Sequence, residues 1–369
     1  MKGKGSGLKG GLFSGRRIGT GDLRTYEDLN KYRRAVSRRS KTILALSILG
    51  LILIFFAALM IGSYRLSVVE VVGMLLGTSD DPVGSYIVTE VRVPRILCCI
   101  AVGAALSASG LVMQSLFKNP MASPSVLGIS SGAAFGASLA LAFGVGGFLG
   151  RYMVPGMAFA FCFITMTAVY MLARTRYGVV STTLLLAGVA IGAFFSGLVS
   201  LLQYVVNENV LSNIVYWTMG SFNNCGWESF QLAIFPVVAG LMIMLFNIKE
   251  LNLVAAGEEQ AVNMGVNIKK LRILMITATS LAVGGSVAIS GVIGFVGLIV
   301  PHIFRMAVGP NHALLMPLCI FGGGIFMILM DTIAKSAFAM SLPVGVLTAL
   351  IGAPFFIYVM RTKKKEIWD

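Results

Sequence analysis

Long apolar runs separated by short polar segments make up most of this sequence. A helix needs about 20 mostly apolar residues to cross the hydrocarbon core of a bilayer. Ten runs approach that length, and the eighth of them is the shortest. We expect membrane-spanning helices at 43–64, 95–116, 125–146, 153–173, 182–205, 230–248, 272–290, 293–308, 312–333 and 342–360. The pattern predicts an all-α integral membrane protein of about ten transmembrane helices.

Composition agrees with this interpretation. The chain is 57% hydrophobic and 12% charged, with a mean hydropathy of +0.87, whereas soluble domains are about one quarter charged. The run 43–64 is too long for the core of a signal peptide, and no small-x-small cleavage site follows it. We therefore expect this run to remain as the first transmembrane helix.

Charge divides the chain into three expected segments. Residues 1–41 hold 12 Lys and Arg against 3 Asp and Glu, which predicts a flexible, basic cytoplasmic tail. Residues 42–361 form the ten-helix transmembrane domain, and residues 362–369 form a short cytoplasmic tail. No folded basic module accompanies the first tail, so we expect contact with anionic lipid rather than with nucleic acid.

The distribution of cations also predicts an orientation. Cytoplasmic loops of membrane proteins carry an excess of Lys and Arg. With ten helices and a cytoplasmic N-terminus, the inner loops and tails collect 24 of the 29 basic residues. Both termini are then cytoplasmic in a multi-pass protein of the cytoplasmic (inner) membrane. The basic residues outside this rule are Arg65, Arg92, Arg95, Arg151 and Lys335.

The sequence lacks the motifs of several kinds of chemistry. The chain has no G-x-x-x-x-G-K-[ST] phosphate loop, so energy from ATP has to come from another subunit. An ion-coupled carrier usually keeps ionisable groups deep in the membrane, and only Asp331 among 15 acidic residues falls within a predicted helix. The cysteines form no C-x-x-C pair, and His302 and His312 lie ten residues apart. We predict neither a catalytic residue nor a metal site.

A short pattern occurs twice. Ala101-Val-Gly-x5-Ser-Gly110 returns as Ala282-Val-Gly-x5-Ser-Gly291 on the second and seventh predicted helices. Those two helices run in opposite directions, as in an inverted repeat. Chance in an apolar, low-complexity setting is the alternative.

Four segments carry a resemblance to a known family. It rests on these segments: Arg92-Val-Pro-Arg95 with Lys118-Asn-Pro-Met-Ala-Ser-Pro-Ser-Val-Leu-Gly128; Leu184-Leu-Leu-Ala-Gly-Val-Ala190; Gly291-Val-Ile-Gly-Phe-Val-Gly-Leu-Ile-Val-Pro-His302-Ile-Phe-Arg305; and Leu342-Pro-Val-Gly-Val-Leu-Thr-Ala-Leu-Ile-Gly-Ala-Pro-Phe355. In order and spacing the sequence closely resembles the permease subunits of ATP-driven importers for iron–siderophore, haem and cobalamin. The resemblance runs from about residue 43 to residue 361, and it implies a structural turn at Pro301-His302.

The resemblance implies a set of partners. It implies a second permease subunit, identical or closely related, two ATP-binding-cassette ATPase subunits, and an extracytoplasmic substrate-binding protein. The chain itself binds no cofactor, because ATP and Mg belong to the ATPase. The implied function is import of a metal chelate by alternating access. A ferric siderophore is the favoured cargo, with haem or cobalamin as alternatives. A self-sufficient secondary transporter is the less favoured class, and a membrane scaffold or receptor without transport is a further one.

Three groups of residues acquire roles by this resemblance. Arg92, Arg95 and Lys335 would face acidic residues of the binding protein, and interfacial snorkelling of long basic side chains is the alternative. A short helix from Glu258 to Met264, ended by Gly265, would contact the ATPase, and a plain amphipathic connector is the alternative. Its predicted contact residues are Gly257, Glu258, Glu259, Ala261, Met264 and Gly265. Asn119, Met121, Ser181 and Thr182 would narrow the cytoplasmic end of the path, and helix capping is the alternative for Ser181.

Overall fold

The computed structural model describes most of the chain. It covers the backbone of residues 26–62, 64–144, 147–175, 178–179, 181–336 and 341–362, and the side chains of residues 41–62, 64–144, 152–174, 182–336, 341–359 and 361. Contacts divide the chain into two units, Met1–Ala45 and Leu46–Asp369. Of the expected basic tail, residues 1–25 lie outside the described residues, and the backbone is helical from Tyr26 onward. The expected tail 362–369 lies outside them from residue 363.

Helices account for nearly all the described secondary structure. They are α1 (Tyr26–Met60), α2 (Val68–Leu75), α3 (Pro82–Tyr86), the π-helix η1 (Ile87–Arg92), α4 (Val93–Leu116), α5 (Ile129–Phe143), α6 (Gly147–Ala173), α7 (Ser181–Val205), α8 (Glu208–Thr218), α9 (Trp227–Phe246), α10 (Ile248–Ala256), α11 (Glu258–Asn263), α12 (Ile268–Ser290), α13 (Val296–Val308), α14 (His312–Ser336) and α15 (Val344–Thr362). Two-residue strands β1 (Arg174–Thr175) and β2 (Gly178–Val179) form an antiparallel pair between α6 and α7.

Each predicted apolar run coincides with one helix. The matching helices are α1, α4, α5, α6, α7, α9, α12, α13, α14 and α15. Within the described residues, seven helices are long and apolar enough to cross a membrane, and the apolar parts of α5, α13 and α15 are shorter. The prediction of an all-α integral membrane protein is confirmed, with seven helices of spanning length and three shorter apolar helices among the described residues.

The boundaries differ from prediction where the backbone bends. The run 125–146 becomes helical only at Ile129, because the segment 117–128 forms turns around Pro120 and Pro124. The run 293–308 becomes helical at Val296, after a segment in which Gly291 and Phe295 have positive φ angles. The turn expected at Pro301-His302 is wrong, because both residues lie inside α13.

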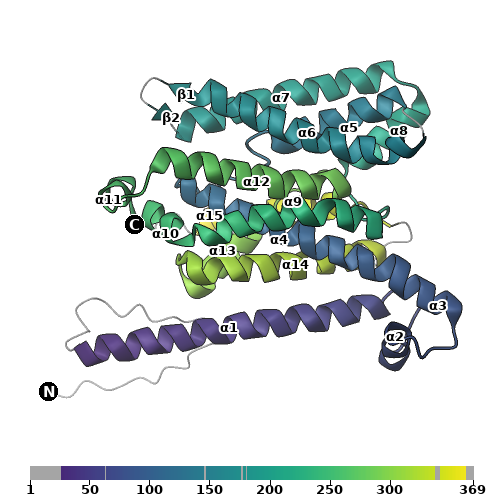
Figure 1. Cartoon of the computed structure of the whole chain (residues 1–369), viewed down its shortest axis with the longest axis horizontal. Helices are drawn as coiled ribbons and strands as arrows, with labels where there is room; N and C mark the ends of the chain where they lie inside the picture. The colour runs from purple at the N-terminus through teal and green to yellow at the C-terminus, as the bar shows by residue number, and fades with distance from the viewer. Residues whose placement is uncertain are drawn as a thin grey trace. The chain divides into compact units, whose positions relative to one another are not determined.

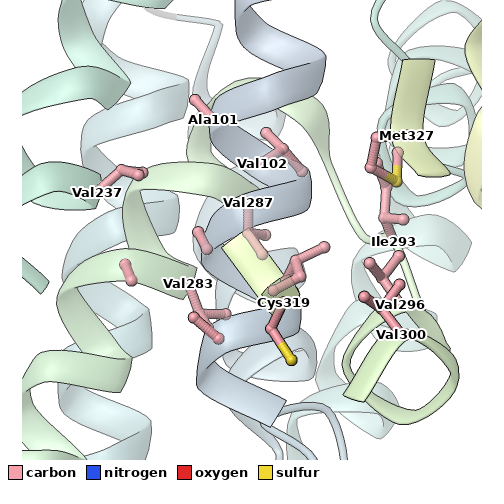
Figure 2. Close-up of a cluster of buried hydrophobic side chains, with 14 of the residues drawn as sticks. Ala101, Val102, Val237, Val283, Val287, Ile293, Val296, Val300, Cys319 and Met327 are labelled. Carbon is pink, nitrogen blue, oxygen red and sulfur yellow. The ribbon is translucent and has the colours of Figure 1, made fainter. Parts of the chain in front are cut away.

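Helix α4 lies at the centre of the unit Leu46–Asp369. It contacts α9, α12, α13 and α14, and its residues are buried almost without interruption from Cys98 to Leu116. Figure 2 shows Val102 of α4 near Val287 of α12. A second group, α5 to α8, packs together and reaches the first through contacts of α12 with α5 and α6.

Small residues bring the backbone of α4 against its neighbours. A Cβ atom built on Gly103 would lie 2.1 Å from the carbonyl oxygen of Gly323 on α14, and one on Gly110 would lie 2.0 Å from that of Gly297 on α13. Ser107 donates a hydrogen bond to the carbonyl of Cys319 at the same crossing. Close approach of this kind is how helices associate in lipid, where apolar side chains gain little by leaving the bilayer.

The two ends of these helices carry different short elements. In Figure 1, α2 and α3 lie at the right-hand end and α10 and α11 at the left-hand end. We call these the α2–α3 end and the α10–α11 end.

The glycine contacts make a direct prediction about stability. Gly110→Ala places a methyl group on the backbone of Gly297, so α4 and α13 have to separate. We expect a loss of about 2–3 kcal/mol in the free energy of unfolding, at the upper part of the range for overpacked cores. Thermal unfolding of the detergent-solubilised protein measures this loss. Gly156→Ala is the matched control, because a Cβ there meets no atom within 4 Å. Equal melting temperatures for the two variants would contradict the assignment.

Candidate functional site

A basic cavity of about 970 Å³ opens at the α2–α3 end. Its walls come from the end of α1 and the segment after it, from η1, from the start of α4 and from the last turns of α14. The charged residues that line it are Arg65, Arg92, Arg95, Asp331 and Lys335. Four cations against one carboxylate make the cavity attractive to anionic groups.

Asp331 is the centre of an ion cluster in this cavity. Its Oδ1 atom accepts from Arg95 Nη2 at 2.7 Å, and its Oδ2 atom accepts from Arg95 Nε at 3.0 Å and from Lys335 Nζ at 2.7 Å. The side chain of Asp331 is 4% exposed, that of Arg95 is 11% exposed and that of Lys335 is 29% exposed. Lys335 is therefore the member of the cluster that offers most of its charge to a partner.

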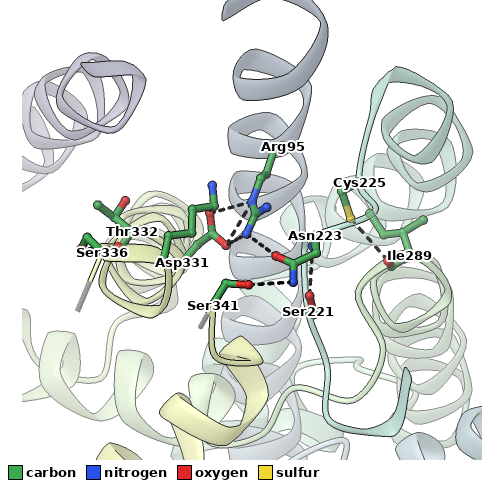
Figure 3. A network of polar contacts seen from close by, with 10 residues as sticks. Arg95, Ser221, Asn223, Cys225, Ile289, Asp331, Thr332, Ser336 and Ser341 are labelled. Carbon is green, nitrogen blue, oxygen red and sulfur yellow. Dashed lines mark hydrogen bonds and ion pairs between the residues drawn. The ribbon is translucent and has the colours of Figure 1, made fainter. Parts of the chain in front are cut away.

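Asn223 extends the cluster to two further segments. Arg95 Nη2 donates to Asn223 Oδ1 at 2.9 Å, and Asn223 Nδ2 donates to Ser341 Oγ at 3.3 Å. Figure 3 shows these side chains converging beside the first turns of α4. The network joins α4 and α14 to the segment between α8 and α9 and to the segment before α15.

Arg92 turns away from the ion cluster. It is buried, and its guanidinium group donates to the carbonyl oxygens of Leu59 and Tyr64. These carbonyls belong to the last turn of α1 and the segment after it, where a cation complements unpaired acceptors. The structure therefore brings Arg95 and Lys335 together on Asp331 and places Arg92 on the carbonyls of Leu59 and Tyr64.

Two helix caps shape the segment beside this cavity. Ser67 and Glu70 form a capping box at the start of α2, and Asp81 caps α3. The backbone N–H of Gly84 and the hydroxyl of Tyr64 hold the pKa of Asp81 below its usual value. The same contact with Asp81 raises the pKa of Tyr64.

The predicted coupling segment forms two short helices at the α10–α11 end. Helix α11 covers Glu258–Asn263 and ends at Met264, followed by Gly265 with φ +87°. Ala261 is buried, and Glu258 Oε1 pairs with Arg272 Nη2 at 2.9 Å. These contacts attach α11 to α12. Gly257 separates α10 from α11 in an extended conformation, and Glu259 is exposed.

Helix α11 and its cap expose two large apolar side chains. Val262 is 57% exposed and Met264 is 68% exposed. An apolar pair on a polar loop is typical of a docking surface. The sequence analysis predicted Met264 as a contact residue and missed Val262, although both lie shortly after Glu258 and Glu259.

The predicted gate residues lie on two segments. Asn119 Oδ1 accepts from the backbone N–H of Met121 at 2.9 Å, and Met121 is 47% exposed. Ser181 is the first residue of α7, and its side chain lies outside the described residues. Thr182 is exposed on the first turn of the same helix. Among the described side chains, no hydrogen bond joins Asn119 or Met121 to Thr182.

A buried polar network that the sequence did not reveal connects α4 with α10 and α14. Asn252 Oδ1 of α10 accepts from the backbone N–H of His312 at 2.8 Å and lies 2.9 Å from its Nδ1 atom. His312 Nε2 lies 2.6 Å from Ser115 Oγ of α4. Both ring nitrogens of His312 are therefore engaged in holding helices together. Within the described residues, no group of three His, Cys, Asp or Glu side chains is placed to hold a metal ion.

Known proteins share this sequence and this fold. The profile of the FecCD transport family matches residues 50–362. The chain belongs to that family. The molybdate import system permease protein of Haemophilus influenzae is 39% identical over 310 residues, which cover 82% of this chain and 91% of the relative. The hemin transport system permease protein of Yersinia pestis is 34% identical over 322 residues, which cover 86% and 96%.

A solved structure gives the same result. A chain of a metal-chelate type ABC transporter in an inward-facing conformation superposes with a TM-score of 0.78 at 38% identity, covering 87% of this chain and 99% of that chain. The protein is therefore the permease subunit of an ABC importer, a multi-pass membrane protein that carries out no catalysis itself. The resemblance found in its four sequence segments is confirmed.

The ion cluster of the permease makes a second prediction. Asp331→Asn removes the one carboxylate that serves both Arg95 and Lys335, and it leaves these two partly buried cations without a counter-ion. Breaking a buried pair in this way costs about 3–5 kcal/mol, which we expect as a loss in the free energy of unfolding. Chemical unfolding of the solubilised permease measures it. Asp80→Asn, on an exposed segment, is the control and changes stability by less than about 0.5 kcal/mol. A variant at Asp331 that is as stable as the control disproves the structural role of the cluster.

Proposed function

We propose that this permease subunit imports a ferric siderophore by alternating access, driven by two separate ATPase subunits. The observation that carries the proposal is the pair of surfaces at opposite ends of the same helices. One end holds an open basic cavity, and the other exposes apolar side chains on a short loop helix. A transport subunit that receives cargo at one face and force at the other needs both surfaces.

The ATPase docks at the α10–α11 end in this proposal. Val262 and Met264 enter a groove of the ATPase, while Glu258 and Ala261 keep α11 fixed to α12. Gly257 precedes α11 in an extended conformation, Gly265 with its positive φ allows the turn after it, and Glu259 is exposed on the same helix. ATP and Mg bind to the ATPase, and this chain binds no cofactor.

An extracytoplasmic binding protein docks at the α2–α3 end. Lys335 is the most exposed member of the ion cluster, and Arg95 stands behind it in the same cluster. Arg92 contributes by holding the end of α1 against η1. Complementary charge at such a surface mainly increases the rate and orientation of docking.

Two permease subunits, identical or closely related, enclose the path. Asn119 and Met121 with Ser181 and Thr182 narrow it toward the α10–α11 end, which is cytoplasmic together with both termini. The surrounding lipid covers the remaining apolar surface, and anionic lipid contacts the basic tail.

The identity of the cargo is the most specific part of the proposal. Import of haem is the second candidate, supported by the extensive match to a hemin permease. Cobalamin import by the same architecture is a further alternative. Another similar permease is named for molybdate import, so similar permeases are named for different cargoes. The permease is therefore to be reconstituted with its ATPase and binding protein, and uptake of a ferric siderophore, hemin, cobalamin and molybdate compared with and without ATP.

The reconstitution decides between the transporter classes. Uptake of the ferric siderophore that requires ATP and the binding protein supports the proposal. Uptake by the permease alone, driven by an ion gradient, contradicts it and favours a secondary transporter.

The exposed apolar pair gives a third prediction. Met264→Asp introduces a charge where the ATPase groove is apolar, so we expect assembly with the ATPase to weaken at least about tenfold. Co-purification and uptake measure this effect. Met264→Leu keeps the apolar contact and is the matched control. Because residue 264 is exposed, both variants fold normally. Assembly of the Asp variant at the level of the Leu variant excludes this surface as the ATPase contact.

Lys335 gives a fourth prediction. Lys335→Gln removes one positive charge, while Arg95 still pairs with Asp331, so the fold is retained. We expect the affinity for the binding protein to fall roughly 3–10-fold at low salt, with a weaker dependence on ionic strength. Lys335→Arg keeps the charge and serves as the control. Unchanged affinity and salt dependence for the Gln variant rule out Lys335 as a docking residue.

A further inference from the structure

Two of the apolar helices are unusually short and occupy corresponding places. Counting the ten apolar helices in chain order, α5 is the third of the first five and α13 is the third of the second five. They contain 15 and 13 residues, or about 22 and 20 Å at 1.5 Å per residue. The hydrocarbon core is about 30 Å thick. In transporters, paired interrupted helices of this kind indicate a binding site.

Each short helix begins at an irregular, buried segment. Before α5, Ser123 and Leu127 are buried in the turns of 117–128. Before α13, Gly291 and Ile293 are buried in the break that follows α12. Irregular backbone at membrane depth occurs only where protein covers it or where it lines a cavity.

A cavity of about 260 Å³ lies between the beginnings of these two helices. Helices α5, α7 and α8 and the break before α13 form its walls, and its lining contains no charged residue. The lining residues that the argument uses are Ser130, Ser131, Ser196, Gln203, Thr218 and Val292. Serine, threonine and glutamine side chains therefore supply hydrogen-bonding groups from three helices.

Part of this hydrogen-bonding capacity is unused. Ser130 is 7% exposed, lines the cavity, and has no hydrogen-bond partner for its hydroxyl group among the described residues. The side-chain amide of Gln203 also has no partner among them. By contrast, Ser131 accepts from Ser196 at 3.4 Å, and Thr218 donates to the carbonyl of Val215 at 2.9 Å. Ser130 is buried and Gln203 is half-buried, and both line the cavity, so both side chains are available to a hydrogen-bonding occupant.

Polar side chains occupy one face of α7. Ser196, Ser200 and Gln203 follow one another at helical spacing along one face of α7. Large exposed apolar residues, including Phe194 and Leu201, point elsewhere on the same helix. Lipid tails would leave the hydroxyl of Ser130 and the amide of Gln203 unpaired, whereas a polar cargo would not.

We propose that this cavity is a cargo-contact site on the transport path, which binds an uncharged, hydrogen-bonding arm of a metal chelate. Amide, hydroxamate and hydroxyl groups have the chemistry that Ser130 and Gln203 recognise. The volume lies below the range for pockets that enclose a whole drug-sized ligand, so the site holds one arm of the cargo. The inference rests on the proposed import function.

Cysteine accessibility tests the site, because the native cysteines are all buried. Ser196→Cys places a thiol on the cavity wall, and Phe194→Cys places one on the exposed apolar surface of the same helix. The assembled transporter in proteoliposomes is treated with a charged, membrane-impermeant methanethiosulfonate. We expect the thiol at 196 to react and the thiol at 194 to stay unmodified. A ferric tris-hydroxamate siderophore, delivered by the binding protein, should slow the reaction at 196 at least about fivefold.

A second pair of variants measures the hydrogen bonds themselves. Gln203→Leu and Ser130→Ala should raise the KM of siderophore uptake about 3–10-fold, with basal ATP hydrolysis and binding-protein docking unchanged. Gln203→Asn, which keeps an amide, should restore part of the loss.

The outcomes separate the two proposals. A thiol at 196 that never reacts overturns the site, and so does one that reacts at the same rate with and without siderophore while the wild-type complex imports it. A complex that imports none of the tested chelates overturns the import function and this inference with it.

Discussion

Direct contact between the backbones of α4 and its neighbours is the constraint on which the rest of the structure depends. In lipid, helices gain little from burying apolar side chains, so close packing and internal polar contacts have to hold them together. Gly103 and Gly110 allow α4 to touch α14 and α13. Only at that distance can Ser107, Ser115 and Arg95 reach partners on neighbouring helices.

The polar contacts follow from this packing and are concentrated at the two ends of the helices. At the α2–α3 end, Asp331 neutralises part of a strongly basic cavity, which holds Arg95 largely buried and still leaves Lys335 partly open. At the α10–α11 end, Asn252 and His312 join α10 to α14 and α4. The segment beside them that exposes Val262 and Met264 is thus attached to the central helix through hydrogen bonds.

The sequence predicted elements well and side-chain directions poorly. Apolar length identified ten helices, and the C-cap rule identified the end of α11 at Gly265, because both depend on local chemistry. Arg92 and Arg95 were identified because they fall on the side of the membrane where the positive-inside rule predicts few basic residues. That rule gave no information on their partners, because the carbonyls of Leu59 and Tyr64 carry no sequence signal. Asp331 was visible as the one acidic residue in a predicted helix, whereas Asn223, Asn252 and Val262 resemble ordinary loop and helix residues.

Asn223 has a mechanical consequence. Asn223 accepts a hydrogen bond from the charged guanidinium group of Arg95, but its bond to Ser341, 3.3 Å long, joins two neutral groups, whereas Arg95, Asp331 and Lys335 are joined by opposite charges. Charge-assisted hydrogen bonds are roughly twice as strong as neutral ones. The hydrogen bond between Asn223 and Ser341 is therefore the weakest contact of the network, and the segment before α15 is held less firmly to it than α4 and α14 are to each other.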